Sequence, residues 1–142
     1  MLPILIAAAL AAAAPLQEEE EAEPGIVTAA PVIYGGAGYQ AAWDRAQRYE
    51  GDGRLGVYRE QTFAPAMNAQ LEDIYHACVI PVAGQLPPTF TLVVSFAASG
   101  EVDGVYVDRR STPSQCMAER IANLTAPPPP VADFAEEIKI VP

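Results

Sequence analysis

Residues 89–107 read TFTLVVSFAASGEVDGVYV, and this stretch decides the fold. Large apolar residues occupy every second position of its first half, the period of a strand with one buried face: Phe90, Leu92, Val94 and Phe96. Ser99-Gly100 supplies a turn, and a valine-rich run returns. Val102 and Val105 are an odd number of residues apart, which indicates a β-bulge near Gly104. The stretch therefore predicts a β-hairpin.

A helix is predicted on each side of this hairpin. The upstream helix carries an apolar stripe at helical spacing: Met67, Leu71, Ile74, Tyr75 and Cys78. For the downstream helix, Thr112 is expected as N-cap, Pro113 as the first helical residue and Gln115 as the partner that closes a capping box. Its apolar stripe is Met117, Ile121 and Leu124.

A third strand is predicted at the end of the chain. Pro127–Pro130 exclude both helix and central strand, so the chain runs extended there. In residues 134–141, Ile138 and Ile140 face one side, and Glu137 and Lys139 face the other. The order from residue 63 is helix, strand, strand, helix, strand. We therefore expect an α+β fold (αββαβ) with two helices packed on one face of a three-stranded antiparallel sheet.

Residues 32–63 are expected to form an N-terminal helix or loop region that precedes a domain at 64–142. An aromatic stripe at helical spacing predicts a short amphipathic helix: Tyr39, Trp43, Ala46 and Tyr49. Gly51-Asp52-Gly53 ends it, and the apolar residues at 55, 57 and 58 indicate a short strand. Whether this region packs on the domain is left open by the sequence.

The beginning of the chain predicts export. Residues 4–14 are an apolar run of about 17 Å if helical, too short for a bilayer core of about 30 Å. The run fits a cleaved signal peptide at 1–14, with Ala11 and Ala13 at the cleavage site. Residues 15–31 read as an acidic, Pro-rich linker. No cysteine follows the run to carry a lipid, so we expect no stable membrane anchor and a periplasmic protein.

The net negative charge of the chain disfavours polyanionic partners. The chain has 18 acidic and 8 basic residues, a net charge of −10. Phosphate backbones and anionic lipids both require basic patches. Nucleic acid is therefore not an expected partner.

The chain has two cysteines. Cys78 ends the upstream helix and Cys116 lies in the first turn of the downstream one. In an oxidising compartment such a pair is expected to form a structural disulfide. The alternative, a redox or catalytic thiol, lacks a C-x-x-C spacing and has only Arg120 nearby to lower its pKa.

Catalysis and metal binding find little support in the sequence. His76 is the only histidine, and on a helix it projects away from Cys78 at i+2, so the two do not chelate one ion. Glu101, Asp103 and Asp108 lie near the hairpin, where exposed carboxylates usually serve solvation. We therefore expect no catalytic residue, no metal and no cofactor.

The order of these features resembles a known family. A helix ending in cysteine (LEDIYHACV) precedes the hairpin and its return strand (GEVDGVYV). A helix with the second cysteine (SQCMAERIANL), a proline cluster (APPPP) and a final strand (EEIKIVP) follow. Residues 67–141 thus resemble the C-terminal domain of TonB-like proteins, most of all the cysteine-containing AgmX/PglI-type branch of gliding-motility proteins.

The resemblance implies a periplasmic, non-catalytic interaction domain linked to envelope transport. In TonB the domain pairs with a strand of an outer-membrane receptor. The matching element here is the last strand, which would bind a protein partner of the envelope by strand pairing: Phe134, Glu136, Ile138 and Ile140. TonB also has an uncleaved anchor and a long Pro-rich spacer, which this chain does not match, so energy transduction is less supported.

Two alternatives remain open at this point. The protein would be a structural subunit of an envelope complex if Trp43, with Tyr39 and Tyr49, docks into a partner. It would belong to another class altogether if it were a secreted enzyme or inhibitor with an unrecognised site.

Overall fold

The described part of the chain comprises residues 29–85 and 89–141 of a computed structural model. The predicted signal peptide at 1–14 and all but the last residues of the predicted linker at 15–31 lie outside it. Within these described ranges, no helix has both the length and the apolar character needed to cross a membrane.

A four-stranded mixed sheet organises the fold, with strand order β1-β3-β2-β4. The predicted hairpin is β2 (Phe90–Phe96) with β3 (Val102–Val107), and the last strand, β4 (Ala135–Ile140), pairs antiparallel with β2. β1 (Val32–Tyr34) adds a parallel strand beside β3. The α+β class is confirmed, whereas the expected three-stranded antiparallel sheet is wrong because β1 extends it.

The hairpin contains the expected bulge. Ser95 pairs with Gly104 and Phe96 with Val102, which leaves Asp103 as the extra residue. A Cβ on Gly104 would lie 2.9 Å from the Tyr106 ring, so the bulge is built around a glycine. Because of this extra residue, the side chains of Val102 before the bulge and Val105 after it both point into the core.

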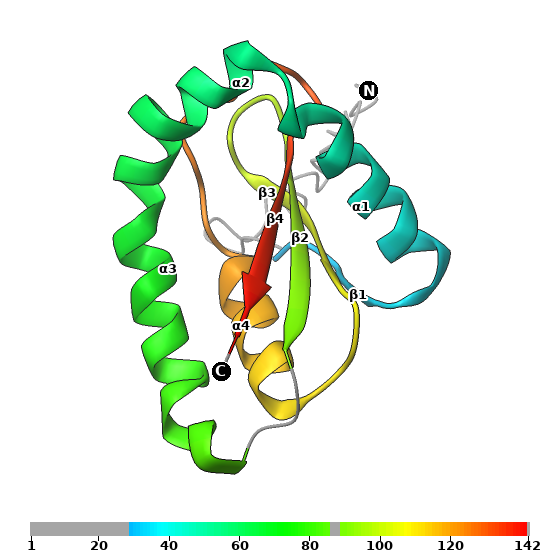
Figure 1. Cartoon of the computed structure of the whole chain (residues 1–142), viewed down its shortest axis with the longest axis vertical. Helices are drawn as coiled ribbons and strands as arrows, with labels where there is room; N and C mark the ends of the chain where they lie inside the picture. Colours follow the sequence, from blue (N-terminus) through cyan, green and yellow to red (C-terminus); the bar gives the residue numbers. More distant parts are fainter. Residues whose placement is uncertain (1–28, 86–88, 142) are drawn as a thin grey trace, which may run out of the picture.

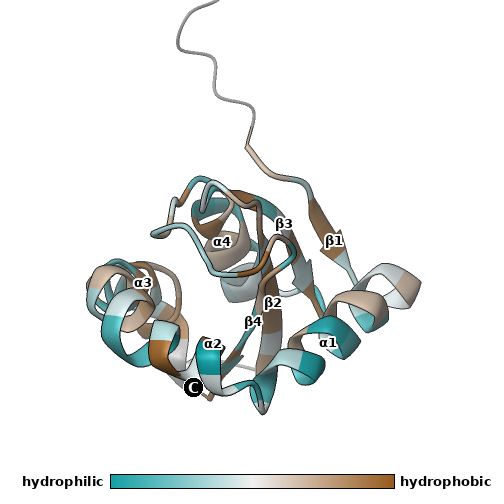
Figure 2. Ribbon diagram, turned by 90° about the horizontal axis from the view of Figure 1, so that it is seen from above, coloured by the Kyte–Doolittle hydropathy of each residue, from teal (hydrophilic) through white to brown (hydrophobic). Residues whose placement is uncertain are grey.

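Two helices cover one face of the sheet, as predicted (Figure 2). They are α3 (Ala64–Cys78), followed by a 3₁₀ turn at Ile80–Gln85, and α4 (Thr112–Ile121). The expected N-cap of α4 is wrong by one residue. Ser111 has the extended backbone of an N-cap and accepts a hydrogen bond from the Ser114 N–H, while the Ser114 hydroxyl accepts one from the Ser111 N–H.

The opposite face is covered by α1 (Gly36–Glu50) (Figures 1 and 2). The chain then crosses to α3 through α2 (Gly53–Tyr58) and a π-helical turn, η2 (Arg59–Phe63). The strand expected at 55–58 is therefore wrong. Asp52 caps a helix there, and the i, i+3 spacing of Leu55 and Tyr58 directs both side chains into the core. Residues 32–63 thus pack on both faces of the sheet.

The core is divided by the sheet. The larger part lies between the sheet and α3 and α4, and includes four aromatic rings whose centroids are 5.4–5.9 Å apart: Tyr58, Phe63, Phe96 and Phe134. The smaller part lies under α1, where Ala42 and Ala46 pack on Val93 and Ala135. Trp43 and Tyr39 are half-buried against this second cluster, so the aromatic stripe of α1 is turned toward the sheet.

The predicted disulfide is present. Cys78 and Cys116 are bonded, with their Cα atoms 5.6 Å apart. The bond joins the C-terminal end of α3 to the first turn of α4, and so ties together the two helices that share one face of the sheet.

Candidate functional site

The candidate site is the outer edge of β4, which ends the sheet. In Figure 1, β4 lies in front of β2 and no described helix or strand is drawn over it. The Phe96 N–H donates to the Phe134 carbonyl at 2.9 Å, which fixes the alternation of the antiparallel ladder. Even-numbered residues of β4 direct their backbone groups toward β2. Glu137 and Lys139 therefore direct theirs outward.

Only part of this edge is accessible. Ala135 also directs its backbone outward, but it is fully buried. Glu137 is half-buried, Lys139 is exposed, and Val141 just beyond the strand is 66% exposed. Among the described residues, no strand pairs with the outer side of β4. The free edge thus runs from Glu137 to the end of the described chain.

A pocket of about 380 Å³ lies beside this edge. Its walls come from α1, η2 and β4, as follows: Ala46, Gln47, Glu50, Arg59, Glu136, Glu137 and Lys139. The lining is mostly polar and contains three carboxylates and two cationic side chains. Five of the seven lining residues are therefore charged.

Arg59 closes one end of the pocket. Its Nε donates to a Glu136 carboxylate oxygen at 2.7 Å, and its Nη1 donates to the Tyr49 carbonyl at 3.3 Å. The guanidinium also lies 5.6 Å from the centre of the Phe134 ring. Arg59 therefore links η2 to the end of α1 and to the beginning of β4, next to the buried end of the edge.

One carboxylate of the pocket, that of Glu136, has a raised pKa. Burial raises the pKa of Glu136 above its usual value, although the hydrogen bond from Arg59 and its charge act in the opposite direction. The charges of Glu137 and Glu50 raise this pKa further. The site is thus a place where negative charge is already crowded, and added positive charge would be favourable.

The two outward-facing residues of β4 have different surroundings. The Glu137 carboxylate accepts a hydrogen bond of 2.5 Å from Nε2 of Gln47 on α1. This partner is neutral, so the charge of Glu137 is not balanced by it. Among the described residues, neither Glu137 nor Lys139 forms an ion pair.

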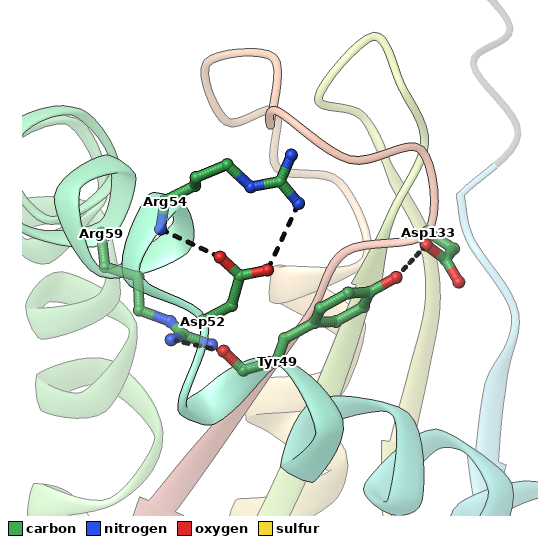
Figure 3. A network of polar contacts seen from close by, with 5 residues as sticks. All are labelled: Tyr49, Asp52, Arg54, Arg59 and Asp133. Carbon is green, nitrogen blue, oxygen red and sulfur yellow. Dashed lines mark hydrogen bonds and ion pairs between the residues drawn. The ribbon is translucent and has the colours of Figure 1, made fainter.

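A polar network holds the corner between α1 and α2 above the site (Figure 3). The Tyr49 hydroxyl donates to Asp133, in the segment before β4, and this bond raises the pKa of Tyr49. Asp52 accepts from the Arg54 N–H at 2.9 Å and pairs with its guanidinium, which lowers the pKa of Asp52. These bonds fix the position from which Arg59 reaches toward the Tyr49 carbonyl (Figure 3).

Of the four residues proposed for partner binding, Glu136, Ile138 and Ile140 lie in β4 and Phe134 directly precedes it. The side chains of Phe134 and Ile140 are in the core, that of Ile138 packs against it, and Glu136 is paired with Arg59. Their backbone groups face β2. The backbone N–H and C=O groups on the free edge are therefore those of the alternate residues, Glu137 and Lys139.

The other sequence candidates are separate from this site. His76 is exposed and lies 3.7 Å from Glu72, one turn away on α3. The described residues contain no group of His, Cys, Asp and Glu side chains arranged to hold a metal. Arg59 and Gln47 were missed by sequence reasoning. The signal for Arg59 would have been a helix at 53–58, which directs residue 59 toward the end of the sheet.

Comparisons of the chain with protein-family models, with curated proteins and with solved structures find no match.

Proposed function

We propose that this protein is a non-catalytic interaction module of the periplasm that binds an extended segment of an envelope protein along β4. The observation that supports this most is the free outer edge at Glu137 and Lys139. An edge strand with unpaired N–H and C=O groups accepts a further strand by main-chain hydrogen bonding. The adjoining pocket leaves room for the side chains of such a strand.

Two further features agree with this proposal. The disulfide fits an oxidising compartment, as the proposed signal peptide at 1–14 requires. The position of the last strand at the end of the sheet fits the role that the resemblance to the TonB C-terminal domain implies. Docking through Trp43 has less support, because the aromatic stripe of α1 is packed on the sheet.

A proline substitution tests the main-chain mode directly. Lys139→Pro removes an N–H that points away from β2, so it costs the sheet none of its own hydrogen bonds and is tolerated at an edge. Lys139→Ala is the matched control, because it removes the same side chain and keeps the N–H. Both variants of the full chain would be used to capture partners from periplasmic and outer-membrane extracts.

We expect the unaltered chain and Lys139→Ala to capture the same envelope protein, and Lys139→Pro to lose it. Capture that survives in Lys139→Pro contradicts strand pairing at β4. Failure of the unaltered chain to retain any envelope protein also counts against the proposal.

A further inference from the structure

The free edge of β4 specifies the charges of the strand that would pair with it. Glu137 and Lys139 direct their side chains toward the α1 face, and Ile138, between them, packs toward the core on the other face. In an antiparallel pair, each side chain lies beside the one directly opposite. An incoming strand is favoured when it sets a cation opposite Glu137 and an anion opposite Lys139.

Read from N- to C-terminus, such a strand is acidic, then apolar, then basic. The residue opposite Lys139 comes first in an antiparallel strand, and the residue opposite Glu137 comes two positions later. Glu137-Ile138-Lys139 is itself acidic, apolar and basic. The edge is therefore complementary to its own sequence.

We infer that a second copy of this chain pairs with the first through β4, antiparallel and centred on Ile138. This inference rests on the strand pairing at β4 that is proposed above, and it names one partner for it. The symmetric register sets Glu137 of each copy opposite Lys139 of the other. The two copies are related by a two-fold axis, so both Glu137–Lys139 contacts are made by the same surface of each copy.

The backbone favours the same register. Glu137 and Lys139 both direct their N–H and C=O groups outward, so pairing one with the other joins free groups to free groups, and each pair exchanges both hydrogen bonds. A slip of one residue would oppose outward groups to groups already bonded to β2. The symmetric register centred on Lys139 would set lysine against lysine.

The surroundings of the edge limit the length of the pairing. Ala135 is buried and Arg59 closes the pocket beside it, so the ladder cannot extend far toward the beginning of β4. The contact is accordingly short, and short interfaces are weak. The dimer is expected to form and dissociate with concentration, and to weaken with added salt, because exposed charges across it are screened.

Charge reversal tests the register. Lys139→Glu sets two glutamates opposite each other at both symmetric positions, and Glu137→Lys sets two lysines there. Each single variant is expected to weaken self-association by about tenfold. The double variant Glu137→Lys/Lys139→Glu restores opposite charges and is expected to regain the affinity of the unaltered chain.

The measurement is sedimentation velocity of the full chain over a concentration series, with circular dichroism and thermal melting as controls for folding. A chain that stays monomeric at all concentrations overturns the inference. So do single reversals without effect, a double variant that is not rescued, or a dimer that persists in Lys139→Pro. If the unaltered chain stays monomeric but captures an envelope protein that Lys139→Pro loses, only this inference is overturned. If the double variant regains self-association but the unaltered chain captures no other envelope protein, only the binding of another envelope protein is overturned.

Discussion

At the scale of single residues, the site depends on a contact between Arg59 and Glu136, which are far apart in the sequence. Both side chains are about one-fifth exposed, and they meet at 2.7 Å across the end of the sheet. Burial nevertheless raises the pKa of Glu136. The ion pair therefore offsets part of the cost of burying this carboxylate, and does not make its ionised form favourable relative to the unfolded chain.

This imbalance predicts a pH dependence for stability. The pKa of Glu136 is higher in the folded protein than in the unfolded chain, so the folded protein binds more protons between these two pKa values. The free energy of unfolding therefore decreases as the pH rises from the ordinary glutamate pKa through the raised one. Glu136→Gln keeps an acceptor for Arg59 and removes this part of the dependence. Denaturant unfolding at a series of pH values should show a flatter curve for the variant. Parallel curves for the two proteins would contradict the prediction.

At the scale of elements, the pairing of α3 with α4 is secured covalently. The bond between Cys78 and Cys116 spans 38 residues and encloses the whole hairpin. The chain-entropy model assigns a loop of this length roughly 4 kcal/mol of stability. This is a large share of what a domain of this size has in total.

Removing the bond should therefore lower stability strongly. The double variant Cys78→Ala/Cys116→Ala is expected to lose about 3–4 kcal/mol in the free energy of unfolding, measured with urea. Reduction of the unaltered chain with dithiothreitol is the matched control and should give a similar loss. A change below about 1 kcal/mol in both would show that packing alone holds the two helices together.

Elements with a long, clear period were predictable, and short ones were not. The hairpin, its bulge, α3, α4 and β4 follow from alternation, stripes and capping residues in the sequence. Residues 55–58 are predicted as a strand, because the apolar residues at 55, 57 and 58 fit the strand period as well as the helical one. Only the Asp52 cap identifies the helix that is present. β1 has three residues, and its partner in the sheet lies about half the chain away. A run so short has too little period to be recognised.

At the scale of the whole molecule, the decisive property is which strands end the sheet. Element order does not determine this, since β4 follows α4 in sequence but lies beside β2. The last strand was predicted as the binding element from the family resemblance alone. The hydrogen bond from the Phe96 N–H to the Phe134 carbonyl shows which residues of β4 direct their backbone groups outward. The alternation of side chains in the sequence does not show this. Arg59 and the burial of Ala135 close one end of the β4 edge, and this too depends on tertiary packing that the sequence does not show.

Amide hydrogen exchange of β4, followed residue by residue with NMR spectroscopy, tests the free edge most directly. In dilute protein we expect slow exchange at Glu136, Ile138 and Ile140, whose N–H groups face β2, and fast exchange at Glu137 and Lys139. At high protein concentration, or with a captured partner, the two fast amides should become protected. Uniform protection along β4 in dilute protein, or fast exchange at Glu137 and Lys139 under every condition, would contradict strand pairing at this edge.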